Sequence, residues 1–104
     1  MLRDPPGPTV GGVNDYLVEQ YLPGVTAREL EDASARLAAA ATELAADGVD
    51  VRYISSTFIP EEESCFCRFE AGQANDVRRA CERAGIALAR IVQTRDLIPR
   101  TEDR

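Results

Sequence analysis

Between Ser64 and Ala71, every second side chain is apolar. One set of alternate positions is apolar throughout (Cys65, Cys67, Phe69, Ala71), and the other is mixed (Phe66, Arg68, Glu70). Successive side chains of a strand point to opposite faces, so this segment is predicted to be a strand with one covered face. An unpaired Arg or Glu on that covered face would cost several kcal/mol. Both thiols are therefore predicted to point into a core covered by helices.

The remaining segments place this strand in a definite order. Strands are predicted at 15–22, 51–59, 64–71 and 86–95, and helices at 26–47 and 74–84. Thr26 and Glu29 form the Thr-x-x-Glu capping box, and Gly48 and Gly85 are the expected helix stops. Strand–helix–strand–strand–helix–strand order predicts an α+β fold, the ferredoxin-like βαββαβ sandwich, with a four-stranded antiparallel sheet and two helices on one face.

The ends of the chain differ in composition from its middle. Residues 1–14 contain three prolines and three glycines, and residues 99–104 are almost all polar. We expect residues 1–14 to be a flexible N-terminal segment, 15–98 to be the ferredoxin-like domain and 99–104 to be a flexible C-terminal tail.

Composition excludes several classes of function. The net charge is −6, so nucleic acid is not an expected partner. The chain has no histidine, so any metal site must use carboxylate, thiolate, tyrosine or backbone groups. No run approaches the roughly 18 apolar residues of a membrane span. Three cysteines without a secretory signal favour a reduced, cytoplasmic setting.

The best candidate site lies on the sheet face away from the helices. In this fold the first and third strands are central neighbours, and Ile54 and Phe58 are expected to be core residues of the second strand. The outer face would then carry polar and aromatic residues, of which the predicted ligand-binding set is Glu19, Tyr21, Tyr53, Arg68 and Glu70. Such a face suits a ligand floor or a dimer interface better than a plain solvent face.

Two interpretations of Glu19, Arg68 and Glu70 remain open. A carboxylate pair beside an arginine can hold a polar ligand or a divalent metal ion, with Glu19 and Glu70 as the metal ligands, or can act as acid and base. The alternative is a cross-strand ladder of ion pairs without a ligand.

The cysteines and the acidic run 61–63 are predicted to have structural roles. Residues i and i+2 of a strand lie about 6.6–7 Å apart, so Cys65 and Cys67 are predicted to pack in the core rather than to bind one metal ion. The acidic run 61–63 is predicted to be a solvated turn rather than a weak site for a hard cation. The third strand also lacks the aromatic and basic pattern of RNA-recognition domains, which excludes that function.

Three stretches carry a family resemblance: residues 16–26, residues 51–60, and the segment Glu63-Ser-Cys-Phe-Cys-Arg-Phe-Glu-Ala71. Over residues 15–96 the chain resembles a family of small uncharacterised bacterial proteins that includes an actinobacterial nickel-binding protein. The resemblance implies a ferredoxin-like fold, a homodimer and metal binding between subunits. The nickel-binding member has adjacent histidines where Glu19 and Gln20 stand here. Because nickel favours nitrogen donors, the lack of imidazole argues against nickel in this chain.

Three functions follow as hypotheses. The favoured one is a cytoplasmic homodimeric binding protein that holds a metal ion or small polar ligand on the outer sheet face. A second is a small enzyme of the dimeric α/β-barrel type with Glu19 or Glu70 as acid or base. A third is an assembly module whose outer face only contacts another copy.

Overall fold

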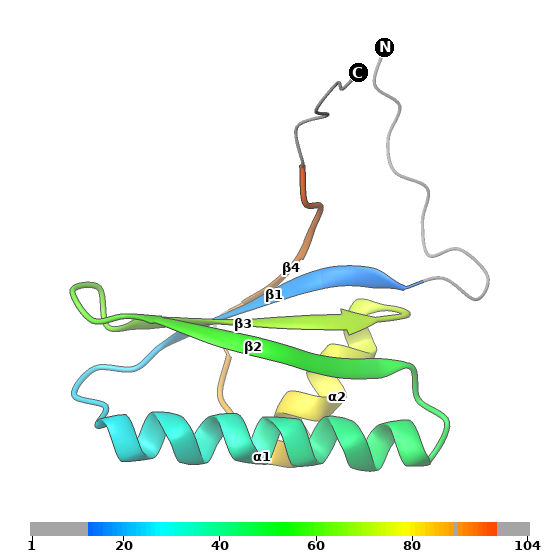
Figure 1. Cartoon of the computed structure of the whole chain (residues 1–104), viewed down its shortest axis with the longest axis horizontal. Helices are drawn as coiled ribbons and strands as arrows, with labels where there is room; N and C mark the ends of the chain where they lie inside the picture. Colours follow the sequence, from blue (N-terminus) through cyan, green and yellow to red (C-terminus); the bar gives the residue numbers. More distant parts are fainter. Residues whose placement is uncertain (1–12, 89, 98–104) are drawn as a thin grey trace, which may run out of the picture.

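The computed structural model describes residues 13–88 and 90–97. The elements are β1 (Asn14–Tyr21), α1 (Ala27–Ala46), β2 (Val51–Ile59), β3 (Ser64–Ala71), α2 (Ala74–Ala84) and β4 (Arg90–Thr94). The four strands form one antiparallel sheet in the order β2-β3-β1-β4. Both helices lie on one face of this sheet (Figure 1). The predicted ferredoxin-like α+β fold is confirmed.

Helix α1 begins and ends where the sequence places its caps. The Thr26 hydroxyl accepts from the backbone N–H of Glu29 at 3.1 Å, and the Glu29 carboxylate accepts from the N–H of Thr26 at 2.9 Å, which completes the capping box. At the other end Gly48 adopts a φ of 91°, a conformation that glycine reaches without strain. Between them, the buried side of the helix consists of Leu37, Ala40, Ala41 and Leu44.

The core lies between the sheet and the helices, and β3 supplies much of it. Cys65, Cys67, Phe69 and Ala71 are buried, whereas Arg68 on the other face is exposed. From α2, Val77, Ala80, Cys81 and Ala84 are buried against them. The predicted alternation of β3 and the position of both its thiols beneath the helices are confirmed.

One bulge in β2 reverses two predicted side-chain positions. Tyr53 pairs with Phe69 and Ser55 pairs with Arg68, so Ile54 is the extra residue of the strand. A bulge shifts the alternation by one residue, which leaves Tyr53 on the helix side and Ile54 42% exposed. The expectations that Tyr53 lies on the outer face and that Ile54 is a core residue were wrong, because both assumed an uninterrupted period of two.

Two strand boundaries also differ from the prediction. β1 starts one residue earlier than expected, and β4 covers only Arg90–Thr94 rather than residues 86–95. The backbone N–H of Ile86 instead donates to the carbonyl of Cys81 at 2.9 Å, and the carbonyl of Ala87 accepts from the Gln20 side chain at 3.2 Å. These bonds hold the start of the predicted strand in the connection after α2. Residues 1–12 and 98–104, which include most of both predicted flexible ends, lie outside the described residues.

The β2–β3 hairpin is attached to the end of β1 by Glu63. Its carbonyl accepts from Leu22 N–H at 2.7 Å, and its carboxylate accepts from Gly24 N–H at 2.9 Å. Glu63 adopts a left-handed backbone, with φ of 53°, which non-glycine residues adopt at a cost. One member of the acidic run 61–63 therefore has a structural contact rather than only solvent. Among the helices described, neither is long and apolar enough to cross a membrane.

Candidate functional site

The sheet surface opposite the helices, here called the open face, consists of four cross-strand rows. The pairing register gives its members as Arg52, Ser55, Thr57 and Ile59 from β2, Ser64, Phe66, Arg68 and Glu70 from β3, Asp15, Leu17, Glu19 and Tyr21 from β1, and Arg90, Val92 and Thr94 from β4. No helix covers this face over the described part of the chain (Figure 1). It is the surface on which the sequence predicted a site.

Each charged residue of the predicted constellation has its own partner. The Arg90 Nε donates to Glu19 Oε1 at 2.7 Å, and Arg52 pairs with Glu70. Arg68 reaches Asp96 at 3.3 Å. The pKa of Arg52 is raised, first by its hydrogen bond to Glu70 and then by the charge of that carboxylate. Two of these pairs join neighbouring strands, as the alternative of a cross-strand ladder expected, but each charged residue of the predicted set pairs with a partner outside that set.

Glu19 and Glu70 do not form one metal-binding pair within a chain. On adjacent strands, Glu19 lies opposite Phe66, and Glu70 lies four residues farther along β3. At about 3.4 Å per residue their Cα atoms are roughly 14 Å apart along the strands. Two carboxylates that share an ion need to lie within a few ångströms of it. A shared ion would therefore need carboxylates from two copies of the chain.

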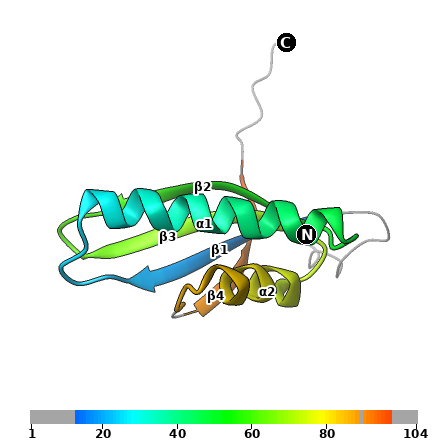
Figure 2. The same cartoon turned by 90° about the horizontal axis from the view of Figure 1, so that it is seen from below.

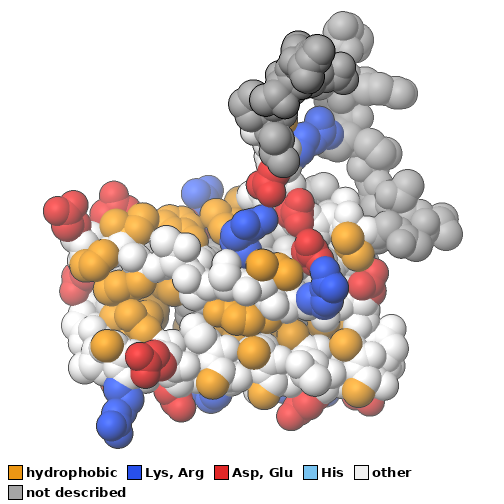
Figure 3. Space-filling view, viewed as in Figure 1, with side chains coloured by type: hydrophobic (Ala, Val, Ile, Leu, Met, Phe, Trp, Pro, Cys, Tyr) orange, Lys and Arg blue, Asp and Glu red, His pale blue; other side chains and the backbone are white. Residues whose placement is uncertain are grey.

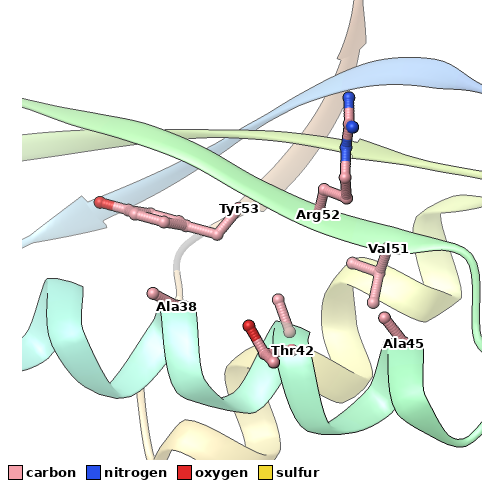
Figure 4. A pocket seen from close by; sticks show the side chains of 7 residues that line it. Ala38, Thr42, Ala45, Val51, Arg52 and Tyr53 are labelled. Carbon is pink, nitrogen blue, oxygen red and sulfur yellow. The ribbon is translucent and has the colours of Figure 1, made fainter.

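The two predicted tyrosines lie in different places. Tyr21 is on the open face at the end of β1 and is 64% exposed. Tyr53 is on the helix side, where its ring packs edge-on against Phe69 at 5.6 Å between centroids. Figure 4 shows the Tyr53 ring over α1, whereas the neighbouring Arg52 points to the other side of the sheet. Tyr53 is therefore not part of the open face.

Three apolar side chains lie among charged ones in the two middle rows of the open face, which the sequence prediction recognised only in part. Leu17 lies between Arg68 of β3 and Val92 of β4, and Phe66 lies in the next row, opposite Glu19. All three apolar side chains are half-buried. Val92 and Arg90 were missed as members of this face. The alternation of Arg90, Val92 and Thr94 is the signal that would have identified them.

Cys67 belongs to a buried chain of polar groups on the helix side. The Ser56 hydroxyl donates to the Cys67 sulfur at 3.1 Å, and that thiol donates to Gln20 Oε1 at 3.5 Å. Tyr53 Oη lies 2.6 Å from the same serine oxygen. Burial raises the pKa of Cys67 from 9.0 to about 12 and that of Cys81 to about 11.

The thiols of Cys67 and Cys81 are therefore protonated at neutral pH, whereas thiolate is the form that binds metals and attacks electrophiles. Within residues 13–88 and 90–97, no group of three or more Cys, Asp or Glu side chains is arranged to hold a metal ion. The structural role predicted for the cysteines is consistent with these positions.

Two hollows follow the seam between β2 and α1, on the side opposite the open face. One has a volume of about 270 Å³ and is lined by α1 residues such as Ala38 and Thr42 and by Val51 and Tyr53 of β2 (Figure 4). The other, of about 310 Å³, lies between Leu30, Ser34 and Phe58. Apolar side chains line this seam on the surface turned to the viewer in Figure 3. Neither hollow includes Glu19 or Glu70.

Comparison with known proteins gives the chain a family. Residues 16–94 match the SCO4226-like family, described as nickel responsive protein SCO4226-like. The chain belongs to this family. The family resemblance inferred from the sequence is thereby confirmed.

The crystal structure of SCO4226 from Streptomyces coelicolor A3(2) has the same fold, with a TM-score of 0.70 at 20% sequence identity. The similarity covers 81% of this chain and 99% of that one. No curated protein matches the chain.

Proposed function

We propose that this member of the SCO4226-like family is a cytoplasmic homodimeric binding protein that holds a small polar ligand between two open faces. The observation that carries the proposal is a group of three apolar side chains on that face, Leu17, Phe66 and Val92, which lie without a covering helix. Exposed apolar patches that are rimmed by polar residues mark association surfaces. The ion pairs Glu19–Arg90 and Arg52–Glu70 are the charged neighbours of these apolar side chains on the same face.

Arg68 is the ligand-binding residue that this arrangement favours most. It lies at the centre of the sheet in the row between Ser55 and Leu17, and its side chain is 45% exposed. A guanidinium presents several donors in a fixed plane, which suits a carboxylate or another oxygen-rich group. Its contact with Asp96 at 3.3 Å is exposed and therefore weak, so a ligand can replace it.

The first experiment measures mass in solution by light scattering coupled to size-exclusion chromatography. The wild-type chain is expected at twice its 11.4 kDa mass. Leu17→Asp places a carboxylate beside Val92 and Phe66 and is expected to give a monomer, whereas the same change at Leu97, which is 83% exposed, leaves the dimer intact. A monomeric wild type, or a dimer that persists in Leu17→Asp, contradicts association through this face.

Native mass spectrometry of protein purified without an affinity tag tests the ligand. A dimer that carries added mass in the wild type and loses it in Arg68→Ala supports the proposal. An assembly module without ligand predicts no added mass and a dimer unaffected by Arg68→Ala. In that case the third hypothesis replaces the binding function.

A divalent metal ion is the second candidate, because the family is described as nickel responsive. Oxygen donors from Glu19 and Glu70 of two copies would supply the ligands, a set that suits magnesium or manganese better than nickel. Elemental analysis of the untagged dimer tests this. About one equivalent of metal that is lost in Glu19→Gln supports it, and less than about a tenth of an equivalent per chain counts against it.

The enzyme alternative draws no support from these comparisons or from the position of its proposed base. Glu19 and Glu70 each form an ion pair with an arginine, and neither lines the hollows along the β2–α1 seam. Enzyme active sites are usually concave and largely enclosed. The binding function therefore takes precedence.

A further inference from the structure

The two helices cover the sheet unequally. α1 has 20 residues and α2 has 11, which correspond to lengths of about 30 Å and about 16 Å. Seen from the helix side, α1 crosses the whole sheet, whereas α2 leaves the last part of β1 without a helix over it (Figure 2). The chain after α2 passes this gap as the irregular connection that begins at Gly85.

A hollow of about 420 Å³ lies in this gap, bounded by the end of β1, the first half of α1 and the connection after α2. Leu22, Val25, Ala33 and Ile86 provide apolar walls. The volume falls within the range of about 300–1,000 Å³ typical of small-molecule sites. It lies on the opposite side of the sheet from the open face; of the open-face residues, Tyr21 at the end of β1 also lines it, whereas Arg68 does not.

Gln20 forms the floor of the hollow and is only 3% exposed. One of its amide N–H groups donates to the carbonyl of Ala87, and its oxygen accepts from Cys67. A primary amide has two N–H donors, and among the described residues only one of them has an acceptor. Because an unpaired buried donor costs about 1–3 kcal/mol, the second N–H favours an acceptor in the hollow.

Arg36 presents further donors from the α1 wall. Its Nε donates to the carbonyl of Ala84 at 3.0 Å, and one terminal nitrogen pairs with Asp32 at 2.6 Å. The bond to the Ala84 carbonyl orients the guanidinium, whereas the pair with Asp32 is exposed and can exchange for a ligand. Asp32 balances the charge of Arg36, and the carboxylate of Glu29 lies at the positive N-terminus of α1, where it caps the helix. The lining therefore combines donors and acceptors with little net charge.

We propose that this hollow binds a neutral aromatic amide or lactam. The ring contacts the apolar walls, the carbonyl accepts from Gln20 and Arg36, and the N–H donates to Asp32. A carboxylate ligand is disfavoured because it meets Asp32 and Glu29, and a cation is disfavoured because it meets Arg36. This site neither requires nor excludes a dimer.

Nuclear magnetic resonance titration with benzamide, benzoate and benzamidine tests the proposal, since the three probes share a ring and differ in charge. Benzamide is expected to give saturable shifts at the Gln20 side-chain amide and at the backbone amides of Gly85 and Ile86. Benzoate and benzamidine are expected to bind at least about tenfold more weakly. Absence of saturable shifts with benzamide, or equal affinity for all three probes, overturns the proposal.

Two variants connect the shifts to the hollow. Ala33→Leu fills the space and is expected to abolish benzamide binding, whereas Ala35→Leu, at an exposed position of the same helix, leaves it unchanged. Gln20→Met removes the donor at similar volume and is expected to weaken binding about tenfold, the equivalent of one hydrogen bond. Retained benzamide affinity in folded Ala33→Leu contradicts the site. If that variant does not fold, retained affinity in Gln20→Met does so.

Discussion

Replacement of Tyr53 by alanine tests which side chains of β2 face the helices. In the structure the ring packs edge-on against Phe69, and the hydroxyl lies 2.6 Å from the Ser56 oxygen. The aromatic pair contributes about 0.5–1.5 kcal/mol beyond its burial, and the hydrogen bond contributes about 1 kcal/mol. With the cavity that remains, Tyr53→Ala is expected to lower the free energy of unfolding by about 3 kcal/mol, the low end for an aromatic deletion because the side chain is half-buried.

The assay is urea denaturation followed by circular dichroism, at one protein concentration for all variants because association affects apparent stability. Tyr53→Phe removes only the hydroxyl and is expected to cost about 1 kcal/mol. Leu97→Ala is the control, since Leu97 is 83% exposed, lies outside the open face, and its loss is expected to change stability by no more than about 0.5 kcal/mol. Equal effects of Tyr53→Ala and Leu97→Ala would refute the helix-side position of Tyr53.

Three further outcomes are expected. The free energy of unfolding should fall from about pH 9 toward pH 11. In this range the folded state keeps the protons of Cys67 and Cys81, whose pKa values are raised from 9.0 to about 12 and about 11, while the unfolded state releases them. Denaturation at several pH values measures the fall, and a pH dependence that is unchanged in Cys67→Ala contradicts this cause. Thr26→Ala removes the capping hydroxyl and should lower the free energy of unfolding by about 1 kcal/mol in the same urea assay. An unchanged free energy would contradict the cap. Glu63→Ala keeps the strained left-handed backbone but loses the bond to Gly24, and it should lower the thermal midpoint by several degrees. Glu63→Gly loses the same bond but relieves the strain, so it should lower the midpoint less. The reverse order would show that the backbone is not strained.

Local sequence signals predicted the fold correctly where one physical rule acted alone. The capping box at Thr26 and the stop at Gly48 located α1, and the alternation of β3 located both of its thiols. These features depend on residues close together in the chain. They did not need any knowledge of tertiary contacts.

The errors lie where tertiary contacts decide. Nothing in residues 51–59 shows that Ile54 is an extra residue, because a bulge depends on how the neighbouring strand pairs. The late start of β4 depends on Gln20, which is 67 residues away from Ala87 and holds its carbonyl. Likewise, the faces of Glu19 and Glu70 were predicted, but their separation requires the register between β1 and β3.

The bulge at Ile54 also bears on what kind of assembly this sheet permits. β2 is an edge strand, and a regular edge offers a row of free backbone groups to which further molecules can add without limit. The extra residue interrupts that row and twists the strand, so edge-to-edge growth into filaments through β2 is disfavoured. Contact through a sheet surface, by contrast, is satisfied once two molecules have met, so the proposed dimer would not grow further.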